Sequence, residues 1–181
     1  MTRARTLASF NPSNINPANL DDTGTIPSAL LDNVGGGNTP SFAAKISGGD
    51  HSISSETNTT VRFGVTDFDT DNAYDTSLYR FVVPIGEAGK YFFSSRIYME
   101  YGNDANELGR LQICKNGTAE AIFGGLANGT ENQGKSLSVD TVLDLAEDDY
   151  IEVKIYHSQG GIQAIDDDPD FSYFYGYKIT A

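Results

Sequence analysis

Apolar and polar residues alternate along residues 79–101, and a turn interrupts the alternation. Two runs rich in aromatic and β-branched residues flank a segment that carries Pro84, Gly86 and Gly89, which is typical of two strands joined by a short connection. Because successive side chains of a strand point to opposite faces, the second run has two distinct faces. One face carries Tyr91, Phe93, Ile97 and Met99, and the other carries Phe92, Ser94, Arg96 and Tyr98.

The second of these faces carries large rings beside its polar residues. A monomeric sandwich usually leaves such a face to solvent and polar side chains. The ring of Phe92 therefore indicates burial against another surface, and an identical subunit is the simplest candidate. The alternative is that Phe92 packs beneath a loop of its own subunit.

Short β-prone runs recur from Ser41 to the end of the sequence, and no segment shows sustained helical periodicity. Glycine-containing turns such as Asn116-Gly117 separate them. Many short strands at roughly 8–12-residue spacing indicate an all-β sandwich or jelly roll. The expected strands are 41–46, 60–65, 79–83, 90–101, 109–115, 119–123, 135–145, 150–156 and 171–180.

Residues 1–40 differ in composition from the rest of the chain. They contain a tandem pentapeptide, Asn-Pro-x-Asn-aliphatic, over residues 11–20, and its prolines disfavour helix and strand alike. We expect an extended arm that becomes ordered on a partner, with residues 35–37, three glycines, as a hinge; a merely flexible tail is the alternative. The anchoring aliphatic residues would be Ile15, Leu20, Ile26, Leu30 and Leu31. The predicted domains are thus the arm, 1–40, and a head, 41–181.

Charge and cysteine content exclude several classes of protein. The formal net charge of −13 argues against binding to nucleic acid or to anionic membranes, which need a basic surface. The single cysteine, Cys114, rules out an internal disulfide, and its apolar surroundings favour an inert buried thiol. The first ten residues lack the apolar core of a secretory signal, and no run reaches membrane-spanning length.

Several short motifs occur in a fixed order along the head. They are Thr60-Val61-Arg62-Phe63, Tyr79-Arg80-Phe81, Tyr91-Phe92-Phe93, Lys115-Asn116-Gly117, Asp148-Asp149-Tyr150 and Tyr173-Phe174-Tyr175-Gly176-Tyr177. From residue 41 to residue 181 this order resembles the globular head of the complement q-subunit and tumour necrosis factor superfamily. The chain departs from the family at Asp148-Asp149, where Gly-Asp is usual, and this leaves the geometry of that turn open. The Gly-x-y stalk of complement heads is also missing.

The resemblance implies a ten-stranded jelly roll that assembles as a homotrimer. Carried over to this sequence, it places Phe92, Ser94, Tyr98 and Phe174 at the subunit interface. The core would contain Phe81, Tyr91, Phe93, Ile113 and Tyr175.

The arm carries a second resemblance. Residues 3–8 (Arg-Ala-Arg-Thr-Leu-Ala) and 26–37 (Ile-Pro-Ser-Ala-Leu-Leu-Asp-Asn-Val-Gly-Gly-Gly) look like the N-terminal stretches of tail-fibre and other virion proteins of tailed bacteriophages. In those proteins such stretches precede a complement-type head. This similarity implies a protein of the phage particle.

Acidic residues are the only candidates for a metal site. Asp67, Asp69 and Asp71 alternate as in a calcium loop, but position twelve of that loop is Leu78 instead of glutamate, so the helix-loop-helix motif is rejected. A looser calcium site stays open, as does a plain acidic loop, and the same choice applies to the carboxylates of residues 166–170. No other cofactor is expected.

No residue pattern indicates catalysis. The two histidines, His51 and His157, and one cysteine do not suit a zinc site, and no Ser-His-Asp arrangement is favoured. A glycosidase pair of carboxylates is not excluded by number, but no motif singles one out. We therefore expect a non-enzymatic protein.

These observations predict a bacteriophage virion structural protein, assembled in the host cytoplasm and released by lysis. The trimeric head would be anchored to other virion proteins by residues 1–40, and would take part in host attachment as a tail fibre or receptor-binding tip. Its outer loops, near residues 66–78, 102–108, 124–134 and 157–170, could contact a host glycan or protein. The alternatives are a purely architectural capsid decoration, head fibre or knob, and, less favoured, a glycan-degrading enzyme.

Overall fold

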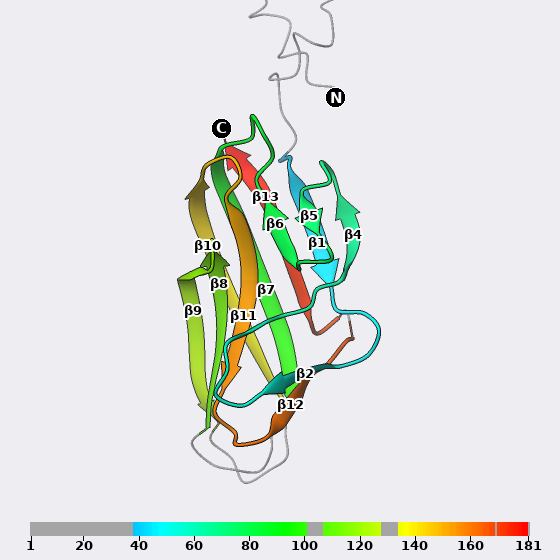
Figure 1. The fold of residues 1–181 in the computed structure, drawn as a ribbon, viewed down its shortest axis with the longest axis vertical. Helices are drawn as coiled ribbons and strands as arrows, with labels where there is room; N and C mark the ends of the chain where they lie inside the picture. Colours follow the sequence, from blue (N-terminus) through cyan, green and yellow to red (C-terminus); the bar gives the residue numbers. More distant parts are fainter. Residues whose placement is uncertain (1–37, 101–106, 128–133, 169, 181) are drawn as a thin grey trace, which may run out of the picture. The chain divides into compact units, whose positions relative to one another are not determined.

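The computed structural model describes residues 38–100, 107–127, 134–168 and 170–180, and in these ranges the chain forms thirteen strands and no helix (Figure 1). The described part accordingly contains no helix that could cross a membrane. The strands are β1 (Ser41–Lys45), β2 (His51–Ser54), β3 (Thr59–Thr60), β4 (Val65–Asp69), β5 (Tyr74–Asp75), β6 (Arg80–Val82), β7 (Gly89–Glu100), β8 (Glu107–Lys115), β9 (Thr118–Ala127), β10 (Lys135–Leu145), β11 (Tyr150–His157), β12 (Ile162–Ile165) and β13 (Tyr173–Thr180).

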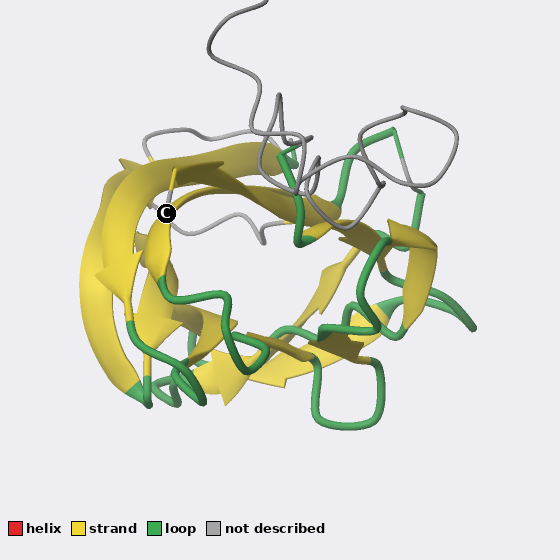
Figure 2. Cartoon of the chain, turned by 90° about the horizontal axis from the view of Figure 1, so that it is seen from above, coloured by secondary structure: helices red, strands yellow, loops and turns green. Residues whose placement is uncertain are grey.

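The strands form two antiparallel sheets. The seven-stranded sheet has the order β2-β12-β7-β13-β1-β4, and β10 pairs with the other side of β7. The six-stranded sheet has the order β5-β6-β11-β8-β9, with β3 paired to β11. Seen from one end, the strands curve around a shared core (Figure 2). The predicted all-β class is confirmed.

The strand count differs from the predicted ten because several short segments form strands of their own. Residues 60–65, expected as one strand, divide into β3, which pairs with β11, and β4, which pairs with β1. The strands β2 and β12 were not predicted. Each has only four residues, which is too short for an alternating signal: β2 has a single aliphatic residue, and the apolar residues of β12 do not alternate with polar ones.

Aromatic rings fill the centre of the core. The ring of Phe42 lies 4.8 Å from that of Tyr74, 4.9 Å from that of Phe174 and 5.2 Å from that of Phe81. These separations are typical of favourable aromatic pairs. Phe42 belongs to β1 of one sheet and Phe81 to β6 of the other, so their contact joins the two sheets.

Two neighbouring residues of strand β13 point to the opposite faces from those predicted. Phe174, expected at the subunit interface, is fully buried in the core, and Tyr175, expected in the core, is half-buried on the outward face. The strand carries a ring at every position from Tyr173 to Tyr177 except Gly176, so its sequence has no period-two signal. A β-carbon added to Gly176 would lie 2.5 Å from Phe93 and 3.0 Å from Phe42, which means that this glycine faces inward.

The turn at Asp148-Asp149 has a defined geometry. Asp148 has a φ of 65°, in the left-handed region that favours glycine. The carboxylate of Asp149 accepts hydrogen bonds from Ala146 N at 2.8 Å and from Asn116 Nδ2 at 2.6 Å, and it pairs with Lys115 Nζ at 2.8 Å. Burial raises the pKa of Asp149, but these hydrogen bonds outweigh burial, so the net shift is downward. The aspartate pair therefore forms a hydrogen-bonded turn in which Asp148 adopts a backbone conformation that favours glycine.

Candidate subunit interface

The outward face of the seven-stranded sheet carries a continuous group of aromatic residues. Cross-strand register sets Phe92 of β7 opposite Val142 of β10 on one side and opposite Tyr177 of β13 on the other. In the next row Ser94 lies opposite Tyr175, which in turn lies opposite Ala43 of β1.

The rings of these residues contact one another. The Phe92 ring lies 5.4 Å from that of Tyr177 and 6.3 Å from that of Tyr175, and Tyr175 lies 5.6 Å from Tyr173. All four side chains are only half-buried in a single copy of the chain. We refer to Phe92, Tyr173, Tyr175 and Tyr177 as the aromatic face. A contiguous, partly exposed group of rings of this kind is typical of an interaction surface.

A second apolar patch lies where the two sheets meet at their edges. Strands β9 and β10 end their respective sheets, and they lie side by side. Ile122 is 56 % exposed, Phe123 45 % and Val142 55 %. We refer to these three residues as the apolar rim. The long strand β9 has no proline or lysine, the residues that usually protect an exposed strand edge.

The structure brings together most of the residues predicted for the interface. Phe92, Ser94 and Tyr98 all lie on the outward face of β7, and the Tyr98 ring is tilted against that of Phe171, with 5.4 Å between the ring centres. Phe174 is the exception, as described above. Tyr173, Tyr175 and Tyr177 were not predicted for this face, because rings at consecutive positions of β13 do not show which ones point outward.

The remaining predicted residues fall into two groups. Phe81, Tyr91, Phe93 and Ile113 are fully buried in the core. The aliphatic residues predicted for the arm all precede residue 38 and so lie outside the described residues, as do 102–106 and 128–133 of the outer loops.

The aspartates of residues 67–71 are occupied by local interactions. Lys45 Nζ forms an ion pair with Asp67, and Asp69 accepts hydrogen bonds from the backbone nitrogens of Ala73 and Tyr74 at 2.9 and 3.0 Å. Asp71 accepts one from Thr70 Oγ1 at 2.6 Å. These residues stabilise a turn, and the described structure does not gather them into a group that could hold a metal ion.

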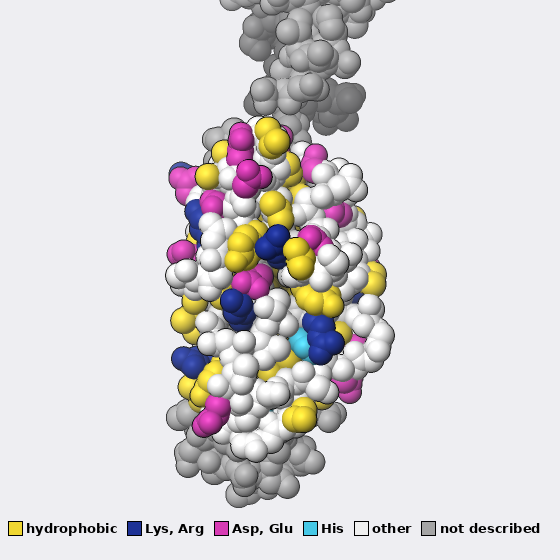
Figure 3. Space-filling view, in the orientation of Figure 1, with side chains coloured by type: hydrophobic (Ala, Val, Ile, Leu, Met, Phe, Trp, Pro, Cys, Tyr) yellow, Lys and Arg dark blue, Asp and Glu magenta, His cyan; other side chains and the backbone are white. Residues whose placement is uncertain are grey.

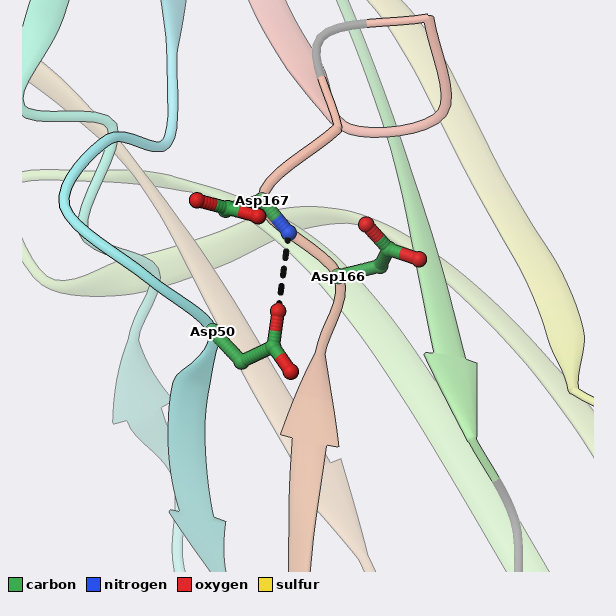
Figure 4. A group of neighbouring side chains, drawn as sticks. All are labelled: Asp50, Asp166 and Asp167. Atoms are coloured by element: carbon green, nitrogen blue, oxygen red, sulfur yellow. Dashed lines mark hydrogen bonds between the residues drawn. The ribbon is translucent and has the colours of Figure 1, made fainter.

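Another acidic group lies beside strands β2 and β12. Asp50, which precedes β2, and Asp166 and Asp167, which follow β12, each have a carboxylate oxygen within 4.8 Å of the others' (Figure 4). The Asp167 backbone nitrogen donates a hydrogen bond to Asp50 at 3.4 Å, and Gly49 N donates one to Asp167 at 3.0 Å. Oxygen ligands of this kind suit calcium. The backbone hydrogen bonds offer a second explanation of this group, because they join the loop before β2 to the loop after β12.

The buried polar side chains have structural roles. His51 Nδ1 accepts a hydrogen bond from Arg62 N at 3.3 Å, and burial and the Arg62 charge lower its pKa to about 4. His157 Nδ1 accepts one from Gln159 N at 3.3 Å, and its Nε2 lies 3.0 Å from Ile53 O. Burial raises the pKa of the Cys114 thiol to about 11. The described part of the chain therefore shows no activated histidine or cysteine nucleophile.

The side of the molecule seen in Figure 3 shows no strongly basic surface. Acidic and basic side chains are interspersed there with apolar ones. Two arginines of the six-stranded sheet stack on tyrosine rings: Arg80 lies 4.5 Å from the centre of the Tyr150 ring and Arg110 lies 4.2 Å from that of Tyr156.

Two solved structures are similar in fold to this chain. The structure of the globular domain of zebrafish complement 1qA is similar, with a TM-score of 0.50 and 16 % identity over 78 % of this chain and 98 % of that one. The structure of Eiger TNF from S. frugiperda has a TM-score of 0.53 and 13 % identity, over 77 % and 92 % of the two chains. No curated protein matches the sequence. The model of the C1q domain matches residues 41–179, so this chain belongs to the C1q domain family.

Proposed function

We propose that this chain is a bacteriophage virion structural protein, in which residues 1–40 anchor a trimeric jelly-roll head to the particle. The head would take part in host attachment, as part of a tail fibre or of a receptor-binding tip. The alternative is a head fibre, knob or capsid decoration with a purely architectural role.

The observation that carries the trimeric head is the aromatic face. A single copy leaves four neighbouring rings partly exposed to water, and apolar burial contributes about 25 cal/mol per Å². C1q and TNF-like domains commonly form homotrimers, which supports a second copy as the occupant of this face. The aromatic face is part of the seven-stranded sheet, so it can be covered without disturbing the core.

The apolar rim supports a closed ring. In a cyclic trimer each contact joins two different surfaces of the subunit, because the same patch does not meet itself as it does across a two-fold axis. In the described structure Ile122 and Phe123 belong to β9 of the six-stranded sheet, whereas Val142 lies opposite Phe92 and continues the aromatic face onto β10. We propose that the apolar rim of one copy packs on the aromatic face of the next.

The viral assignment rests on the arm. The stretches 3–8 and 26–37 resemble N-terminal segments of phage tail-fibre and other virion proteins. C1q and TNF-like domains are typically non-enzymatic, which favours attachment or architecture over glycan degradation. The aspartates occupied by local interactions and the hydrogen-bonded histidines of the described residues point in the same direction.

The decisive experiment locates the protein in purified phage particles. Stoichiometric presence by quantitative mass spectrometry, followed by cryo-electron microscopy of particles, tests the virion assignment and shows whether the head lies on the tail or the capsid. Purified full-length protein that competes with phage for adsorption to host cells would support attachment, and failure to compete would support the architectural alternative. Complete absence of the protein from particles would overturn both.

A further inference from the structure

Asn116 holds two turns of the head together. It lies in the turn between β8 and β9, and its side chain reaches the turn between β10 and β11. Its Nδ2 donates a hydrogen bond to the carboxylate of Asp149 at 2.6 Å, and its Oδ1 accepts one from Tyr150 N at 2.9 Å. Its backbone nitrogen also donates to Tyr150 O, at 2.9 Å. The amide therefore uses both of its polar atoms, one as a donor and one as an acceptor.

The residue after Asn116 makes this amide chemically vulnerable. It is Gly117, which has no side chain to hinder an attack of its backbone nitrogen on the Cγ of Asn116. In that reaction the Gly117 nitrogen bonds to Cγ, and its proton departs with the amide group as ammonia. Water then opens the cyclic succinimide at either carbonyl, which leaves aspartate or isoaspartate at position 116. Loss of the amide in this way is one reason why asparagine is a thermolabile residue.

The hydrogen bonds of Asn116 oppose this reaction while the turn is closed. The ring can form only when Cγ moves onto the Gly117 nitrogen, so the side chain must first leave Asp149 and Tyr150. A reaction that requires a rarely opened state is slowed by the fraction of time that the state is populated. Each hydrogen bond shifts that equilibrium towards the closed turn. The closed turn thus protects Asn116, and opening exposes it.

An aspartate at position 116 would not suit the closed turn. Burial raises the pKa of Asp149, but hydrogen bonds from Lys115 and Asn116 outweigh burial and lower the net pKa, so this carboxylate is ionised at neutral pH. A second ionised carboxylate has no hydrogen to donate, and the contact of 2.6 Å would then join two anions. Lys115 Nζ, 2.8 Å from Asp149, offsets only one of the two charges. Deamidation therefore favours the open turn.

We infer that Asn116 is a site of spontaneous deamidation, that the reaction takes place when the turn between β8 and β9 opens, and that the product weakens the closing of this turn. Because the loss of ammonia is irreversible, aged protein should accumulate a form in which the two turns are no longer joined. The inference depends neither on the trimer nor on the viral assignment.

The rate of the reaction tests the protection. The full chain is incubated at mildly alkaline pH with and without urea, and its peptides are quantified by mass spectrometry, with isoaspartate as the marker of the cyclic route. In urea, Asn116 should convert as fast as Asn128, which has the same Asn-Gly-Thr sequence and lies outside the described residues. Without urea, Asn116 should convert at least about tenfold more slowly than in urea. Equal rates in the two conditions, or no conversion in urea, would overturn the inference.

A pair of backgrounds tests the effect of the product. Asn116→Asp, which reproduces the aspartate form, should lower the thermal midpoint of the full chain at neutral pH. The matched control is the same substitution in an Asp149→Asn background, where amide and carboxylate exchange places and the repulsion is absent. There Asn116→Asp should leave the midpoint unchanged or raise it. An equal loss in both backgrounds, or no loss in either, would mean that the product does not oppose the turn, and the inference would be wrong.

Discussion

At the scale of single residues, His51 combines burial with a hydrogen bond that requires a neutral ring. Its side chain is 4 % exposed, and its Nδ1 accepts the backbone N–H of Arg62. Protonation would remove this acceptor and place a positive charge beside Arg62. The pKa of His51 is therefore lowered from its ordinary value of 6.5 to about 4. Burial of the ring is the larger cause, and the charge of Arg62 is the smaller.

This residue predicts a pH dependence of stability. Between pH 6.5 and 4 the unfolded chain binds a proton at His51 that the folded chain does not, so the free energy of unfolding falls as the pH falls through this window. The full loss is about 3 kcal/mol. His51→Asn, which keeps an acceptor without a titrating ring, should flatten the pH dependence of urea unfolding by that amount. An unchanged pH profile in the variant would contradict the assignment.

At the scale of strands, β13 presents neighbouring residues with opposite roles. Phe174 is fully buried against Phe42 and Phe63, whereas Tyr175 lies on the aromatic face. Phe174→Ala should lower the free energy of unfolding by about 3–5 kcal/mol. Tyr175→Ala should leave the head folded and weaken association instead. Denaturation and sedimentation of the two variants give the comparison, and the opposite pattern would show that the strand faces are exchanged.

Strands with strict alternation could be predicted from the sequence, and those without it could not. Residues 135–145 and the start of β11 agree with expectation because most of their apolar residues occupy alternate positions. β2 and β12 were missed because their pairing depends on each other and on β7, which the sequence does not reveal locally. Tertiary contacts determined these strands, not their own composition.

The candidate interface shows the same division. Phe92 could be identified because a ring stood among polar residues on one face of a regular strand. The tyrosines of β13 could not be assigned to a face from the sequence. Both faces of the strand carry rings, so a ring would enter the core whichever face pointed inward.

At the scale of the whole molecule, assembly links stability to protein concentration. When unfolding also separates three subunits, each tenfold rise in concentration adds about 0.9 kcal/mol per subunit to the free energy of unfolding. The thermal midpoint of the full chain should therefore rise with concentration. Phe92→Ser should reduce or remove this dependence. A midpoint independent of concentration in the original protein would contradict the trimer.

Gly176 has a consequence for how β13 finds its place. A strand with rings on both sides loses little apolar burial when it slips by one residue, although every side chain changes face. In the correct alignment Gly176 leaves room for the rings of Phe93 and Phe42. In the shifted alignment a residue with a side chain would take this place and clash with them. A larger residue at position 176 would clash in the correct alignment as well, so the two alignments would no longer differ in energy at this point. A methyl group at this position should therefore do more than crowd the core: it should let refolding chains accumulate in a competing, misaligned form.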